Sequence, residues 1–198
     1  KITVVQNEFS QIDKRFFFPI AKRIRWRKPL WRIQLKQRNS ILPILQSIEK
    51  KGTLLFGDLD EFPNHCKLKH LISLTSKNQW EVYSLNQIQL VYNLRTKDGH
   101  TPWYGTIGCS IKNARNSTPN KLRKLRHNSE KIEGGWHFSY FGNKNQIQKK
   151  IRSVAPVEKH FNLSNPSLEE VSDTIKSKAN PFSKIKPDQI EISIDEYP

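Results

Sequence analysis

The chain contains no methionine and only two cysteines among its 198 residues. Because it begins at Lys1 and has no methionine, we expect the natural protein to begin upstream of this segment. Cys66 and Cys109 lie far apart, and neither has the spacing of a metal-binding cysteine motif. A cysteine-based metal site is therefore not predicted. Two free core thiols are the simplest interpretation, and a disulfide stays open.

Long hydrophobic runs are also lacking. None approaches the roughly 18–20 apolar residues that a membrane-spanning helix needs, and no signal-peptide pattern is present. Apolar residues make up 35% of the chain and aromatic residues 10%, which excludes a disordered composition. The length suits one domain with a sizeable core.

Acidic residues are scarce relative to basic ones. The chain has 18 acidic and 34 basic residues, for a net charge of +16. Such an excess predicts an anionic partner, either nucleic acid, an anionic membrane surface or a phosphorylated substrate. The basic residues cluster in Lys22–Arg32, Lys121–Arg126 and Lys144–Arg152. Each cluster is equally compatible with a solvated face.

One segment concentrates the scarce carboxylates. The apolar run Thr53–Phe56 predicts a buried strand, and Asp58, Asp60 and Glu61 follow it before Pro63. Like charges at the end of a core strand are unfavourable unless a cation lies between them. A divalent metal with a phosphate on its far side is the simplest such cation. The pattern therefore predicts an Asp-x-Asp metal–phosphate site, although solvated turns also produce it.

The remaining pattern alternates strands with helices, which favours an α/β sheet with ligands at the carboxyl ends of its strands. We predict strands at Ile2–Val5, Thr53–Phe56, Ile88–Leu94, Trp136–Phe141 and Ile190–Ile194. We predict helices from Asn39 to Gly52, after the cap Asn64, after Thr118-Pro119, over Lys144–Arg152 and over Ser167–Lys178. Gly134-Gly135 predicts a turn.

Aromatic residues gather in Gly134–Gly142. An extended backbone there places Trp136, Phe138 and Tyr140 on one face, with His137 on the other. Flat rings beside polar groups are typical of sugar recognition. The same aromatic face would also suit a hydrophobic core.

Three segments together resemble the family 17 glycosyltransferases. They are Asp58–Pro63, the stretch Trp103-Tyr104-Gly105-Thr106, and Gly135-Trp136-His137-Phe138-Ser139, in the order and approximate spacing of the family. The resemblance covers roughly residues 2–152. It departs from the family at Pro156, where many members have a histidine, and in lacking the family's first strand and helix.

The resemblance implies a single-domain α/β fold of the GT-A type. Residues 1–160 would form the catalytic domain, and 161–198 would be a C-terminal extension packed on it. The implied reaction is inverting transfer from a UDP-sugar, with N-acetylglucosamine expected, to a glycan or glycolipid acceptor. The implied cofactor is Mn²⁺ or Mg²⁺.

The resemblance also suggests roles for individual residues. Asp60 would bind the metal directly, and Asp58 would contact it through water or hold the ribose. Glu61 and Glu158 are alternative catalytic bases, and His160 or water is an alternative metal ligand in place of the missing histidine. The sugar site would be lined by Trp103, Trp136 and His137. The diphosphate would be steadied by Lys121, Arg123 and Arg126, which otherwise form a solvated basic helix.

Two other functions stay open at this point. A metal-dependent nuclease would explain the positive charge directly, but no nucleic-acid motif is present, so nucleic acid is not the favoured partner. A glycan-binding protein without activity is the third interpretation. The sequence does not identify the compartment: a microbial or viral protein would be cytoplasmic or peripheral to a membrane, and a eukaryotic one would be in the Golgi lumen.

Overall fold

A computed structural model describes residues 35–49, 51–98, 102–154 and 165–179. Within these ranges no helix is both long enough and apolar enough to cross a bilayer. Several sequence predictions fall outside the described residues, namely Ile2–Val5, Lys22–Arg32, Pro156, Glu158, His160 and Ile190–Ile194.

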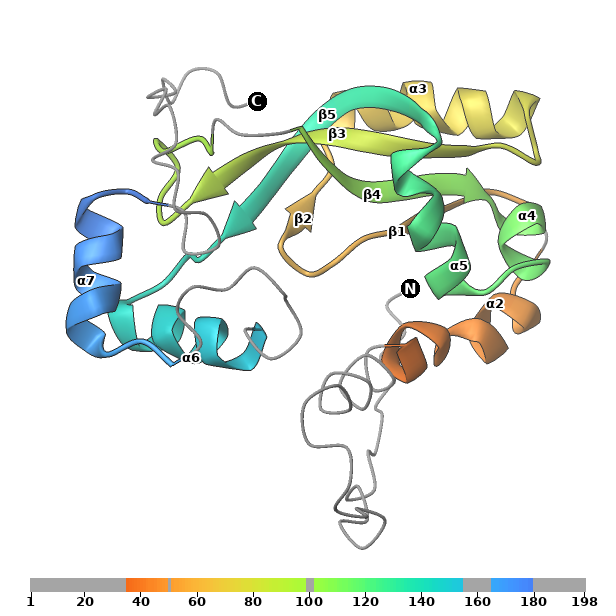
Figure 1. Cartoon of the computed structure of the whole chain (residues 1–198). Helices are drawn as coiled ribbons and strands as arrows, with labels where there is room; N and C mark the ends of the chain where they lie inside the picture. The colour runs from red at the N-terminus through yellow and green to blue at the C-terminus, as the bar shows by residue number, and fades with distance from the viewer. Residues whose placement is uncertain (1–34, 50, 99–101, 155–164, 180–198) are drawn as a thin grey trace, which may run out of the picture.

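The centre of the molecule is a curled five-stranded sheet (Figure 1). Its order is β1-β4-β3-β5-β2, and its strands are β1 (Thr53–Phe56), β2 (Glu61–Phe62), β3 (Val82–Val91), β4 (Trp103–Ser110) and β5 (Glu130–Ser139). β3 and β5 are parallel, and the other neighbouring pairs are antiparallel. The predicted mixed α/β class is confirmed, with a sheet that is largely antiparallel.

Helix α3 (His65–Lys77) covers one face of the sheet (Figure 1). Its Leu71 is fully buried with Tyr83, Leu85 and Ile132 of the strands. The predicted cap is confirmed, because the side chain of Asn64 accepts a hydrogen bond of 2.9 Å from the backbone N–H of Cys66.

The core on the opposite face is covered by α2 (Leu42–Ser47), α4 (Ile111–Arg115) and α5 (Pro119–Lys124). Leu45, Ala114 and Leu122 of these helices pack with residues of β3 and β4, namely Val82, Ile107 and Cys109. The buried thiol of Cys109 belongs to this core, and Cys66 is exposed; both are free.

The two predicted helices at this face have different outcomes. The helix predicted from Thr118-Pro119 is confirmed as α5, because Thr118 caps it and Pro119 lies in its first turn. The helix predicted from Asn39 to Gly52 is wrong at both ends, because α2 begins after Ile41, without a side-chain cap. Helix α2 stops at Ser47, because the backbone of Ile48 is extended.

Helices α6 (Lys144–Val154) and α7 (Leu168–Lys176) form a third core. Ile147 and Ile151 of α6 pack against Val171 of α7 and Tyr140 at the end of β5. Ser167 and Glu170 form a capping box that starts α7. The predicted helices at these positions are confirmed.

The predicted turn at Gly134-Gly135 is wrong, because both glycines lie inside β5. The pairing of β5 with β3 shifts register here, between Asn86 and Ile88. Gly135 has a φ of +113°, and a Cβ atom at this position would collide with the carbonyl oxygen of Phe62. Gly135 therefore lets edge strand β2 approach an irregular point of β5, and Gly134 makes room for the side chain of Lys67 on α3.

Candidate functional site

The acidic residues lie on the connection between β1 and β2, which are the two edge strands of the sheet. Residues 57–60 cross the end of the sheet, and the N–H of Glu61 bonds the carbonyl oxygen of Asp58 at 3.1 Å to close the turn. Glu61 then pairs with His137 of β5. The turn therefore carries the Asp-x-Asp residues directly to the Trp-His segment.

The carboxylate of Glu61 is the buried centre of the site, and its side chain has no exposed surface. It accepts hydrogen bonds from the indole N–H of Trp103 at 3.0 Å and the hydroxyl of Thr106 at 3.3 Å. The backbone N–H of Asp58 adds another at 3.0 Å. Each donor stabilises the ionised form of the carboxylate.

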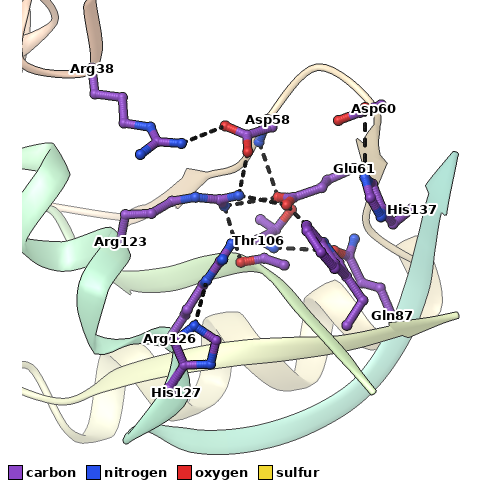
Figure 2. A network of polar contacts seen from close by, with 12 residues as sticks. Arg38, Asp58, Asp60, Glu61, Gln87, Thr106, Arg123, Arg126, His127 and His137 are labelled. Carbon is purple, nitrogen blue, oxygen red and sulfur yellow. Dashed lines mark hydrogen bonds and ion pairs between the residues drawn. The ribbon is translucent and has the colours of Figure 1, made fainter. Parts of the chain in front are cut away.

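Arg123 is the cation that pairs with this carboxylate (Figure 2). Its two terminal nitrogens lie 2.9 and 2.6 Å from the two oxygens of Glu61, which is a bidentate pair. Nη2 also bonds Asp58 at 2.5 Å, and Nη1 bonds the carbonyl oxygen of Gly105 at 3.2 Å. Burial disfavours the charge of Glu61, but Arg123 outweighs this effect and lowers the pKa of Glu61.

Asp60 points to a different pair of partners (Figure 2). Its carboxylate lies 2.8 Å from Nζ of Lys150 on α6 and 3.6 Å from Nε2 of His137. Burial opposes ionisation, yet the hydrogen bonds and charges of His137 and Lys150 hold the pKa of Asp60 far below its usual range. About a third of its side chain remains exposed, so an ionised carboxylate faces solvent here.

A stacked pair of rings lies beside these carboxylates. The ring of His137 stacks on Trp103, with centroids 4.0 Å apart and planes 14° from parallel. The guanidinium of Arg126 lies 5.3 Å from the centre of the Trp103 ring. The site therefore combines an aromatic stack, an ionised carboxylate and cations.

Trp136 lies apart from this group. It neighbours His137 in β5, and neighbouring strand residues point to opposite faces. The aromatic face of β5 instead continues through Phe138, whose ring is 5.0 Å from Phe62 and 5.1 Å from Phe141. This face borders an open apolar cavity of about 690 Å³, lined by Asn93, Leu94, Arg95, Phe138 and Phe141.

The two aspartates do not fit a shared metal ion as they are arranged here. Asp58 is paired with Arg123 and lies 3.7 Å from Arg38, whereas Asp60 is paired with Lys150 and His137. Among the described residues, no group of three or more His, Cys, Asp or Glu is placed to hold a metal. The positive charge that the acidic cluster requires is thus supplied by the side chains of the chain itself.

Several residues of the site were missed from the sequence. Thr106 and Gln87 are buried polar residues, and the side-chain oxygen of Gln87 accepts a hydrogen bond of 3.2 Å from the N–H of Thr106. Lys150 belongs to a basic cluster that was visible in the sequence, but nothing local singled it out. Of the predicted diphosphate ligands, Arg123 is buried in an ion pair, Arg126 borders the stack and Lys121 is exposed on α5.

Comparison of the chain with protein families, curated proteins and solved structures finds no match.

The ionised carboxylates predict a defined dependence of stability on pH. The ordinary pKa values of Asp60 and Glu61 are 3.8 and 4.5, and both are lowered in the folded protein. Their stabilising contribution is therefore fully present above these ordinary values and is lost as the pH falls toward the folded values. We expect the free energy of unfolding, measured with urea, to fall steeply below pH 4.5.

A matched pair of variants tests whether Asp60 causes part of this pH dependence of stability. In Asp60→Asn this decline should be shallower than in the unchanged protein. Asp173→Asn is the control, because Asp173 is a largely exposed carboxylate that lies 3.8 Å from Lys176. If the free energy of unfolding fell equally steeply with pH in Asp60→Asn and in the unchanged protein, Asp60 would not be a source of this pH dependence.

Proposed function

We propose that the chain is a glycosyltransferase that moves a sugar from a UDP-sugar to a glycan or glycolipid acceptor. The supporting observation is that the three segments of the family 17 resemblance contact one another. Trp103 donates a hydrogen bond to Glu61, 42 residues away in the chain, and its ring stacks on His137. If the three segments matched the family only by chance, their side chains would not be expected to contact one another in the structure.

The chemistry of the site suits this reaction. His137, which stacks on Trp103, lies 3.6 Å from Asp60, and Asp60 offers an ionised, partly exposed carboxylate to the hydroxyls of a sugar. A diphosphate leaving group needs positive charge beside it as its own charge develops, and the site contains several cations. N-acetylglucosamine as the sugar, inversion at its anomeric carbon and the GT-A fold belong to the proposal through the family resemblance.

Glu61 enters this proposal as a positioning residue. Its oxygens accept hydrogen bonds from Arg123, Trp103 and Thr106, so it keeps these three side chains in place. A general base must reach the acceptor hydroxyl directly. Glu158 stays the predicted base, although it lies outside the described residues. Mn²⁺ or Mg²⁺ stays a prediction of the resemblance, and no step of this proposal depends on it.

A ligand screen by thermal denaturation tests the function. UDP-, GDP- and CDP-sugars are each added with EDTA and with Mn²⁺. A ligand at 100 times its Kd stabilises by about 2.7 kcal/mol, which raises the Tm of a protein of this size by roughly 5–10 °C. We expect such a shift for a UDP-sugar. No shift with any nucleotide sugar, together with salt-sensitive binding of oligonucleotides, would contradict the proposal and favour the nuclease.

A further inference from the structure

Three guanidinium groups surround two carboxylates at the acidic turn. Arg38 meets Arg123 and Arg126, which lie three residues apart, beside Asp58 and Glu61 (Figure 2). Arg123 alone forms close ion pairs with both carboxylates, at 2.5 and 2.6 Å. Arg123 carries one positive charge against the two negative charges of Asp58 and Glu61, so with Arg38 and Arg126 the group has a net charge of +1.

Arg38 is held beside the turn but is only loosely paired. The side-chain oxygen of the next residue, Asn39, accepts a hydrogen bond of 3.1 Å from the N–H of Asn120 at the start of α5. This bond fixes the segment next to the helix that carries Arg123. The guanidinium of Arg38 nevertheless stays 3.7 Å from Asp58, which is longer than a charge-assisted hydrogen bond.

Arg126 lies on the other side of Arg123. Its Nε bonds the ring of His127 at 3.1 Å. In the described part of the chain, no recorded hydrogen bond uses its two terminal nitrogens. Burial, and then the charge of Arg123, lowers the pKa of Arg126. The charges of Glu61 and Asp58 oppose this effect, and Arg38 adds a smaller lowering. Guanidiniums gathered this closely repel one another, and a bound anion would relieve that repulsion.

We propose that Arg38 and Arg126 bind the diphosphate of the nucleotide donor directly, with no divalent ion between protein and phosphate. This inference rests on the proposed function and names the residues that hold its donor. Two guanidiniums, one on each side of Arg123, suit a ligand with two linked phosphates better than a ligand with a single phosphate. Arginine binds phosphate oxygens through paired N–H groups. Asp58 lies between Arg38 and Arg123, and the three guanidiniums together exceed the charge of Asp58 and Glu61 by one.

Calorimetric titration with inorganic pyrophosphate and with UDP tests the proposal. Each ligand is titrated into the full chain in EDTA and again in Mn²⁺. The variants are Arg38→Ala and Arg126→Ala, and Lys124→Ala is the control because it removes an equal charge from an exposed position of α5. A hydrogen bond to a charged group contributes about 1.5–3 kcal/mol. We therefore expect each arginine variant to bind pyrophosphate about 10- to 150-fold more weakly in EDTA, and the control to bind within about twofold of the unchanged protein.

The outcomes separate this inference from the proposed function. UDP-sugar turnover that requires Mn²⁺ and is indifferent to both arginine variants would overturn the inference and leave the function standing. Arginine-dependent binding of pyrophosphate without any UDP-sugar turnover would support the anion site and overturn the function. Tighter, salt-sensitive binding of a short oligonucleotide at the same arginines would overturn the diphosphate assignment. Circular dichroism of each variant verifies that it is folded.

Discussion

Replacing Arg123 by alanine should destabilise the protein by about 3–5 kcal/mol, which is the cost of breaking a buried ion pair from one side. Arg123 is 3% exposed, and its partner Glu61 has no exposed side-chain surface. Removal of the guanidinium leaves the buried carboxylate without its bidentate partner. Urea unfolding at neutral pH measures the effect.

Two comparisons make this prediction specific. Lys124→Ala, at the next and exposed position of α5, should change stability by no more than about 0.5 kcal/mol. The double variant Glu61→Leu/Arg123→Leu should recover much of the loss, because replacing both partners of a buried pair by apolar groups is often nearly neutral. An Arg123→Ala protein within 1 kcal/mol of the unchanged protein, by the same measure, would show that the pair is not buried as described.

Asp60→Ala should lower UDP-sugar turnover by about 100-fold or more, the size expected when a charged group is lost from an active site. Asp60 is ionised, partly exposed and in contact with both Lys150 and His137. Its loss removes a carboxylate from the proposed sugar site and leaves Lys150 and His137 without this partner. Transfer of labelled N-acetylglucosamine to a glycan acceptor measures turnover.

The fold should survive this substitution, because Asp60 lies on a turn with part of its side chain in solvent. The Tm and the circular dichroism spectrum verify this. Asp173→Asn, a change at an exposed carboxylate of α7, should keep full turnover. Turnover of Asp60→Ala close to that of the unchanged protein would remove Asp60 from the site.

Short sequence patterns predicted the helices and strands that depend mainly on neighbouring residues. Strand β1 follows from a short apolar run, and α3 and α5 follow from the caps Asn64 and Thr118. Strand β4 was not predicted, although it is a central strand of the sheet. The two consecutive glycines in β5 look like a turn in sequence, and only the approach of β2 explains why they lie in a strand.

The sequence also predicted only part of the candidate site. The Asp-x-Asp turn and the Trp-His segment were identified, and the structure brings them into contact through Asp60 and His137. The engagement of Glu61 by Arg123 was not foreseen, because Arg123 is one of three closely spaced basic residues in α5. Nothing in that run distinguishes the buried Arg123 from the exposed Lys121 and Lys124.

By itself, the sequence determined that three carboxylates after an apolar strand need positive charge nearby, because ionised groups are unfavourable in a poorly solvated environment. That strand is a half-buried edge strand, and not the buried strand predicted. Only the tertiary structure decided which cations supply the positive charge. Arg123 is 62 residues from Glu61, and Lys150 is 90 residues from Asp60. Such pairings depend on how helices dock on the curled sheet, and docking is driven by apolar burial that carries no information about charge partners. The acidic pattern in the sequence therefore required a cation, and the packing of the helices on the sheet placed Arg123 and Lys150 beside it.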